Sequence, residues 1–255
     1  MLQTEQDLSP VAERMAKGVL RMLRPHTVEG RGKIRVGNLH DGGYIMLDAL
    51  DGVSVAYSLG INGDVGWDLD MARRGVSIRQ YDHTIDQLPA EHPLFQWKKI
   101  GIAAAPDPRA RLDTLENLIR QNGDEGRTDM VLKCDIEGAE WQMLANTPNM
   151  VLRQFRQIVL EMHGFEHLCA HDGADVARRA IANLTAGHRL VHVHANNYAP
   201  WAVVGGIPIP DVLEMCFARL DLGTFTPSDE RFPTPIDMPC RPDAADLYLG
   251  SFTFE

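Results

Sequence analysis

The chain has 255 residues, 44% of them hydrophobic, and a formal charge of -10 at pH 7. A chain of this length can bury one substantial core, so we expect a single domain over residues 1–255. Its acidic charge argues against non-specific nucleic-acid binding, because phosphate backbones are held by basic surfaces. No run reaches the roughly 20 apolar residues of a membrane span. The N-terminus also lacks the apolar core and cleavage site of a signal peptide.

The chain contains four cysteines, and none of them form a C-x-x-C pair. Their spacing predicts neither a zinc site nor a disulfide framework. Free thiols of this kind are typical of proteins in a reducing cytosol, and we therefore expect a cytoplasmic protein. The cysteines are Cys134, Cys169, Cys216 and Cys240.

Residues 1–50 are expected to form a cap made of a helix and a hairpin. Ser9 and Pro10 predict a helix start, with serine as the N-cap and proline at the first helical position. Apolar residues recur at helical spacing over residues 11–23, and the polar face carries both signs of charge, so we expect this helix to pack on the domain and not on a membrane. An Asp-Gly-Gly turn between two β-favouring runs predicts a hairpin over residues 34–46.

Strand and helix patterns alternate over residues 51–220, which predicts an α/β fold with a mostly parallel sheet. The last two strands are expected to pair as an antiparallel hairpin. The remaining residues 221–255 form a C-terminal extension, in which residues 247–252 are predicted to be an edge strand or an interface segment. The seven expected strands cover residues 53–58, 76–81, 97–102, 129–135, 157–163, 189–197 and 212–220. The main helices are expected to begin at about residues 67, 112 and 174.

A glycine-containing loop follows the first core strand and leads into a helix, as in nucleotide-binding α/β folds. Asp82 comes about 20 residues later, at the end of the second strand, where a carboxylate can accept hydrogen bonds from a ribose diol. The loop is not a G-x-G-x-x-G sequence, and the helix start offers no obvious pyrophosphate site. This pattern favours a nucleoside ligand without phosphates, such as S-adenosylmethionine, over NAD.

Polar residues follow three later strands at the point where each strand ends. Because the carboxyl ends of parallel strands meet at one edge of a sheet, these side chains are expected to lie together at the edge where ligands bind. Burying such groups is costly unless they pair with each other, a ligand or a metal. The residues are Asp135 and Glu137 from the fourth strand, Glu161 and His163 from the fifth, and His194, Asn196 and Asn197 from the sixth.

Several of these motifs resemble the FkbM-type methyltransferases and related methyltransferase-like proteins. The similarity runs in the same order from about residue 35 to about residue 220. It implies a Rossmann-like, class I methyltransferase that uses S-adenosylmethionine, with a hydroxyl of a sugar, polyketide or other small metabolite as the acceptor. The motifs are Asp41-Gly42-Gly43-Tyr44, Tyr57-Ser58-Leu59-Gly60, Asp82, Asp135-Ile136-Glu137-Gly138-Ala139-Glu140-Trp141, Glu161-Met162-His163 and His194-Ala195-Asn196-Asn197.

The resemblance also implies which residues contact the cofactor. Asp82 would hold the ribose, and Asp135 would face the amino group or the reacting centre. The loop Gly60-Ile61-Asn62-Gly63-Asp64 departs from the Gly-x-Gly-x-Gly of many class I enzymes, which leaves its backbone contacts open. The implied cofactor residues are Asp41, Gly42, Ser58, Leu59, Gly60, Gly63, Asp64, Asp82, His83 and Asp135.

Methyl transfer requires that nucleophile, methyl group and sulfur be aligned, and an alcohol nucleophile must also lose its proton. Our hypothesis is that His163 is the general base, oriented by Glu161 or Asp135. His194 is the second choice for the base.

Three alternatives remain open. In the first, which we favour less, Asp135, Glu161, His163 and His194 bind a divalent cation that lowers the pKa of a substrate hydroxyl. In the second, the domain binds a nucleoside cofactor without catalysis, although the acids at three strand ends argue against this. In the third, the protein is a metal-dependent hydrolase that uses His192, His194 and Asp135. Against this alternative, the sequence has no H-E-x-x-H ligand pair, and Asp82 would have no role. The acceptor, expected to be a small molecule, and the oligomeric state are not specified by the sequence.

Overall fold

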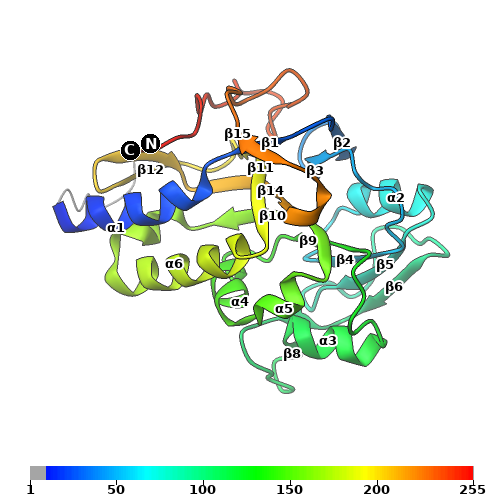
Figure 1. The fold of residues 1–255 in the computed structure, drawn as a ribbon. Helices are drawn as coiled ribbons and strands as arrows, with labels where there is room; N and C mark the ends of the chain where they lie inside the picture. Colours follow the sequence, from blue (N-terminus) through cyan, green and yellow to red (C-terminus); the bar gives the residue numbers. More distant parts are fainter. Residues whose placement is uncertain (1–9, 255) are drawn as a thin grey trace.

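The computed structural model describes residues 10–254, apart from the side chains of Cys169 and His171, so the expected Ser9 N-cap lies outside the described residues. A seven-stranded sheet with the order β11-β14-β10-β9-β4-β5-β6 forms its centre (Figure 1). All strands are parallel except β14, which is antiparallel to both of its neighbours. The strands are β4 (Val55–Leu59), β5 (Ser77–Tyr81), β6 (Phe95–Lys98), β9 (Met130–Cys134), β10 (Phe155–His163), β11 (His188–Ala195) and β14 (Val212–Arg219).

This arrangement confirms the predicted mixed α/β class, with a mostly parallel seven-stranded sheet and an antiparallel pairing of the last two strands. The central strands β4 and β9 are buried along their whole length, as expected for parallel strands covered on both faces. Successive side chains point to opposite faces. Tyr57 and Leu132 therefore join the hydrophobic core on one face, while Ala56 and Val131 join the core on the other.

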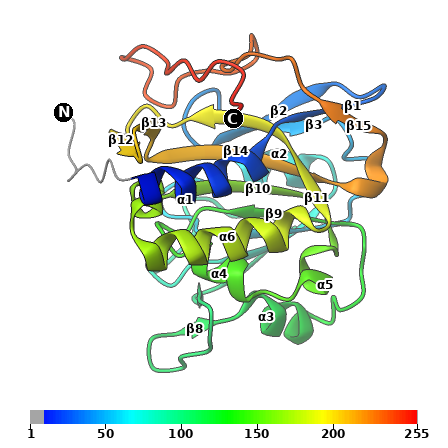
Figure 2. The same ribbon diagram turned by 60° about the vertical axis from the view of Figure 1, so that its left-hand side comes forward.

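Helices and hairpins cover the two faces of the sheet differently. Figure 2 shows α1 and α6 lying side by side along the face that also carries α4. The opposite face is covered by α2 and the predicted hairpin of β2 and β3, whose apolar side chains form the second core. The elements are α1 (Pro10–Leu20), α2 (Gly66–Arg73), α3 (Leu115–Asn122), α4 (Glu140–Asn146), α5 (Asn149–Leu152), α6 (His171–Thr185), β2 (Lys33–Gly37) and β3 (Gly43–Leu47), with 3-10 turns at Arg21–Leu23, Phe165–Cys169 and Leu220–Leu222.

The N-terminal helix α1 packs on the domain, as predicted. Its buried face consists of Ala12, Ala16, Val19 and Leu20, each at most 1% exposed. Within residues 10–254, no helix combines the length and the apolar character needed to cross a membrane.

The predicted third strand, residues 97–102, was wrong in its bounds. Strand β6 ends at Lys98, where the Ile100 amide donates to the Lys98 carbonyl at 2.8 Å and turns the chain. Gly101–Ile102 forms a separate short pair, β7, with β8 at Leu112–Asp113. The next helix therefore starts at Leu115 instead of residue 112, because the Thr114 side chain caps it by accepting from the Asn117 amide.

The C-terminal third also differs from the prediction. Segment 247–252 is not an edge strand, since its pairing in the described structure is an isolated bridge between Gly250 and Phe232. Strand β15 (Phe225–Pro227) instead pairs with β1 (His26–Val28), which the sequence pattern did not predict. The segment between β11 and β14 contains a further hairpin of β12 (Trp201–Val204) and β13 (Ile207–Pro210).

The buried side chain of Gln157 on β10 joins the hairpin β2–β3 to the sheet. Its Oε1 accepts from the Leu47 amide at 2.9 Å, and its Nε2 donates to the Leu47 carbonyl at 3.0 Å. We expect Gln157→Leu to lower the free energy of unfolding by about 2–4 kcal/mol, because both backbone groups lose their buried partner. Chemical denaturation measures this change. Gln87→Leu, at an exposed position after β5, is the control and should stay within about 0.5 kcal/mol of the wild type.

Candidate active site

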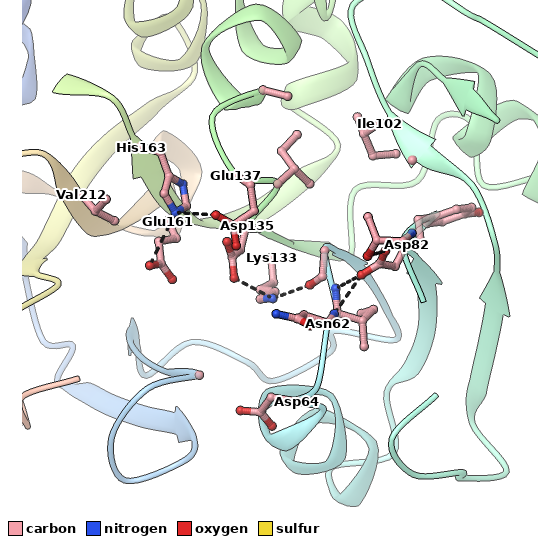
Figure 3. A pocket seen from close by; sticks show the side chains of 18 of the residues that line it. Asn62, Asp64, Asp82, Ile102, Lys133, Asp135, Glu137, Glu161, His163 and Val212 are labelled. Atoms are coloured by element: carbon pink, nitrogen blue, oxygen red, sulfur yellow. Dashed lines mark hydrogen bonds and ion pairs between the residues drawn. The ribbon is translucent and has the colours of Figure 1, made fainter. Parts of the chain in front are cut away.

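A cleft of about 1130 Å³ opens at the carboxyl ends of β4, β5, β9 and β10 (Figure 3). This is the edge at which ligands bind in open α/β sheets. The structure brings most of the predicted site residues together in its lining. These are Asp41, Gly42, Gly60, Gly63, Asp64, Asp82, His83, Asp135, Glu161 and His163.

The glycine loop after β4 is held against the end of β9 by a very close backbone contact. A Cβ atom on Gly60 would stand 1.6 Å from the carbonyl oxygen of Asp135, and Gly60 has a φ of +78°. The Nζ of Lys133 donates to the Gly60 carbonyl at 2.7 Å and fastens the same contact. Glycine is therefore required at position 60. The preceding Ser58 and Leu59 are fully buried within β4 and do not line the cleft.

Asp82, which follows β5, stabilises the glycine loop by hydrogen bonds to its backbone. Its Oδ2 accepts from the amides of Ile61 at 2.9 Å and Asn62 at 2.8 Å, and its Oδ1 accepts from the amide and hydroxyl of Thr84. Burial alone would raise the pKa of Asp82, but these hydrogen bonds lower it to about 2. A carboxylate has about four acceptor positions, so a ribose hydroxyl would have to share them with the protein's own chain.

Lys133 lies at the floor of the cleft and was not among the predicted site residues. Its Nζ is 3.6 Å from an Asp135 oxygen and 6.0 Å from the centre of the Tyr44 ring. Burial would lower the pKa of Lys133, but the neighbouring carboxylates of Asp135 and Asp68 raise it overall. Lys133 therefore remains charged. The position of Lys133 inside the apolar run 130–134 could have indicated a role in the site, because a buried ammonium group needs a partner.

His163 stands at the other end of the cleft, and its ring is oriented by Glu140. The Nδ1 atom lies 3.2 Å from Glu140 Oε1, whereas the Nε2 atom is 3.7 Å from Glu137 Oε2 and 3.9 Å from Glu161 Oε1. Glu140 is fully buried and also accepts from the amides of Ile136 and Gly138. The orienting carboxylate is thus Glu140 and not Glu161 or Asp135, because Glu140 reaches Nδ1 from the first turn of α4.

The charged neighbours of His163 and Glu161 shift the pKa values of both groups. Burial would lower the pKa of His163, but its hydrogen bond to Glu140 and the charge of Glu161 raise it overall. Burial raises the pKa of Glu161, and the nearby carboxylates of Asp135 and Glu214 raise it further. Several acidic side chains therefore lie close together at this end of the cleft, and their negative charge favours the protonated forms of His163 and Glu161 and the binding of cations.

Two further polar side chains hold Glu161 in place. Asn196 donates to Glu161 Oε1 at 2.7 Å, and the Tyr44 hydroxyl donates to Oε2 at 3.3 Å. Asn196 lies near the end of the sixth predicted strand, and Tyr44 follows the Asp-Gly-Gly turn. Both belong to motifs of the sequence, but a single sequence does not show which acid they contact.

His194 does not reach the cleft. It is 1% exposed, with Nδ1 at 2.7 Å from Glu214 and Nε2 at 3.1 Å from Asp246. The four side chains considered for a catalytic cation are consequently separated, since Asp135 and His163 gather with Glu140 while His194 gathers with Glu214 and Cys240.

The set considered for a hydrolase is separated as well. His192 binds Asp237 at 2.8 Å in a buried pair, and neither residue lines the cleft that contains Asp135. Asp237, the partner of His192, and Asp246, one of the two carboxylate partners of His194, come from the C-terminal extension. No sequence pattern indicated that this extension passes over β11.

No protein-family model matches the chain. It is 30% identical over 125 residues to "Probable methyltransferase-like protein 24" from Homo sapiens, and the match covers 43% of this chain and 34% of that protein. The chain thus spans about a third of the length of that relative. A solved structure, "Putative hemolysin from Streptococcus thermophilus", is 10% identical with a TM-score of 0.35, covering 67% of this chain and 62% of that chain. The match to the human protein supports a methyltransferase-like relationship.

We expect Asp82→Asn to lower the free energy of unfolding at pH 7 by roughly 1–3 kcal/mol, because the amide nitrogen cannot accept the hydrogen bonds that one oxygen accepted. The pKa of Asp82 in the folded state is about 2, below its ordinary value of 3.8. The wild-type advantage is therefore complete above about pH 4 and is lost as the pH falls toward 2. Urea unfolding of the wild type and of Asp82→Asn between pH 7 and pH 3 measures how the difference between their free energies of unfolding decreases.

Asp48→Asn, at an exposed position after β3, is the matched control for this measurement. Its stability should follow that of the wild type at every pH. Equal stability of Asp82→Asn and the wild type at pH 7 would show that the loop does not depend on Asp82.

Proposed function

We propose that this chain is an S-adenosylmethionine-dependent methyltransferase of the FkbM type, which methylates a hydroxyl of a small metabolite or sugar in the cytoplasm. The observation that carries the proposal is the cleft in which the glycine loop and Asp135 lie beside the Glu161–His163 pair. The match to a human methyltransferase-like protein supports the same activity. The sheet order, with one antiparallel strand inserted next to the end, supports it as well.

The side chains in the cleft fit the two ends of such a cofactor. Small and apolar residues, Ile102, Ala103 and Leu112, line the end near β5 and suit a purine ring. A Cβ atom on Gly63 would meet nothing within 4 Å, so the loop leaves open space for a ligand. Carboxylates including Asp135 line the other end and suit an amino group and a positive charge.

When bound, the cofactor supplies a methyl group on a positively charged sulfur. The protein's own contribution is to place the acceptor hydroxyl and to receive its proton. Glu140 holds Nδ1 of His163, while Nε2 lies between Glu137 at 3.7 Å and Glu161 at 3.9 Å in the cleft lining, so Nε2 is the nitrogen directed at the acceptor end. His163 takes the proton there, and the surrounding carboxylates stabilise the charged ring that results.

The cofactor can be tested by calorimetric titration of the purified protein with S-adenosylhomocysteine. We expect saturable binding to the wild type. Asp135→Asn should weaken the affinity about tenfold or more, since removing one charge-assisted hydrogen bond costs at least about 1.4 kcal/mol. The Asp48→Asn variant should bind like the wild type. An absence of binding heat at millimolar ligand would contradict the use of this cofactor.

The base can be tested by following S-adenosylhomocysteine release with a panel of sugars and small hydroxylated metabolites. For any accepted substrate, His163→Ala should lower turnover by about 10²–10⁴ while leaving S-adenosylhomocysteine affinity near the wild-type value. The raised pKa of His163 predicts that wild-type turnover rises with pH above neutrality, as the neutral ring becomes populated. Glu140→Gln should move this rise to lower pH.

The control for the base is His167→Ala, at an exposed position after β10. It should keep both the rate and the pH profile of the wild type. Near wild-type turnover in His163→Ala would remove His163 from the role of base.

A further inference from the structure

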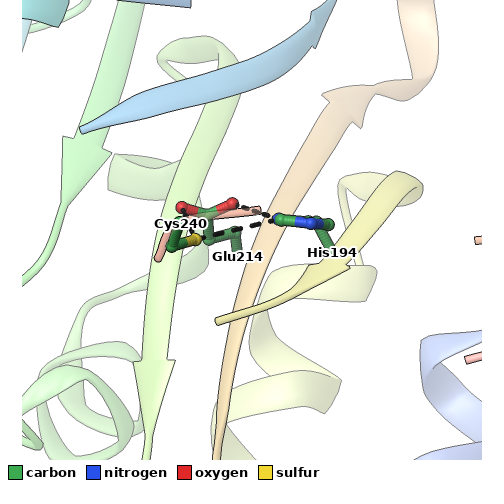
Figure 4. A group of neighbouring side chains, drawn as sticks. All are labelled: His194, Glu214 and Cys240. Atoms are coloured by element: carbon green, nitrogen blue, oxygen red, sulfur yellow. Dashed lines mark hydrogen bonds and ion pairs between the residues drawn. The ribbon is translucent and has the colours of Figure 1, made fainter. Parts of the chain in front are cut away.

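Three potential metal ligands, none of which lines the cleft, meet close to one another (Figure 4). His194 comes from β11, Glu214 from β14 and Cys240 from the C-terminal extension. All three are buried, at 1%, 5% and 1% exposure. One ligand atom from each lies within 4.8 Å of the other two. The methyltransferase proposal does not use Glu214 or Cys240.

The spacing of these atoms is close to that of three corners of a zinc site. Nδ1 of His194 is 2.7 Å from one Glu214 oxygen, and Sγ of Cys240 is 3.4 Å from the other. The Sγ to Nδ1 distance is 4.0 Å. Tetrahedral zinc, with bonds of about 2.3 Å to sulfur and 2.0–2.2 Å to nitrogen and oxygen, separates its ligand atoms by about 3.3–3.6 Å. Each observed distance is within roughly 0.6 Å of this separation, and the two distances to Glu214 are to different oxygens of its carboxylate.

The second nitrogen of His194 is engaged as in known zinc sites. Nε2 lies 3.1 Å from both oxygens of Asp246. A metal-bound histidine usually gives its other N–H to a carboxylate, which sets the tautomer and the ring direction. Asp246 thus directs Nδ1 toward Glu214 and Cys240.

The local charge also favours a cation. Glu214 belongs to a second group of close oxygens with Asp41 and Glu161, and Asp246 adds another carboxylate beside His194. Buried negative charges that exceed their partners are costly to keep ionised. A divalent ion among His194, Glu214 and Cys240 would offset this charge.

We propose that His194, Glu214 and Cys240 bind a zinc ion that fastens the C-terminal extension to β11 and β14. A mixed set of sulfur, nitrogen and oxygen donors suits zinc, and a water molecule can complete the fourth corner. Binding replaces the thiol proton of Cys240 and the Nδ1 proton of His194, and both protons pass to solvent without any change in oxidation state. This inference is independent of methyl transfer.

Cobalt is the probe for the first test, because a cobalt–thiolate bond gives a charge-transfer absorption band. Protein freed of metal by a chelator is titrated with Co²⁺, and we expect a band that saturates at about one ion per chain and disappears when Zn²⁺ is added. Cys240→Ala should abolish the band. Cys216→Ala removes another buried free thiol on β14, outside the cluster, and should keep it. No band in the wild type, or a band that persists in Cys240→Ala, would overturn the proposal.

Two measurements cover the case in which Cys240→Ala does not fold. X-ray absorption of the zinc-loaded wild type should show one sulfur at about 2.3 Å with nitrogen and oxygen at about 2.0–2.2 Å, and a shell without sulfur would contradict the site. Zinc should also raise the thermal midpoint of the wild type and of Cys216→Ala, and slow proteolysis of the extension. An unchanged midpoint on zinc addition would show that the ion does not fasten the extension.

Discussion

The contact between Gly60 and the carbonyl of Asp135 is the constraint on which the cleft depends. The loop after β4 passes the end of β9 so closely that no side chain fits at position 60. Lys133 and Asp82 then hold this loop from two sides, by a hydrogen bond to the Gly60 carbonyl and by bonds to the amides of residues 61 and 62. The charged side chains of Lys133 and Asp82 therefore have a structural role, because they hold the backbone that forms the cleft.

Side chains at the His163 end of the cleft also hold the structure in place. Glu140 ties the backbone of the loop between β9 and α4 and also positions the ring of His163. Glu161 is held in turn by Asn196 and Tyr44, which come from distant parts of the chain. His163 and Glu161 thus each have partners that fix their side chains, as in pre-organised sites.

Local patterns were sufficient for the sheet and for one edge of the cleft. Apolar runs that stop abruptly in acids located the ends of β9 and β10, and with them Asp135, Glu161 and His163. Strand ends are local features, and parallel strands bring them to one edge. The role of Asp82 as a brace was not visible, because it depends on how the glycine loop folds back in three dimensions.

Predictions failed where the partner came from far along the chain. His194 was expected in the cleft, but Glu214 and Asp246 hold it elsewhere. The extension that supplies Asp237 and Asp246 has little regular structure, so neither strand nor helix periodicity indicated where it lies. Likewise, β15 is a three-residue strand that exists through its pairing with β1, about 200 residues away.

The position of β14 has a consequence for how the chain is made. Strand β14 lies between β10 and β11, although both of those strands leave the ribosome first. Until residues 212–219 are synthesised, the largely buried strands β10 and β11 have no partner on their facing edges. Unpaired apolar edges are templates for association with other chains. A nascent chain stalled before β14 would therefore depend on chaperones more than the finished protein does.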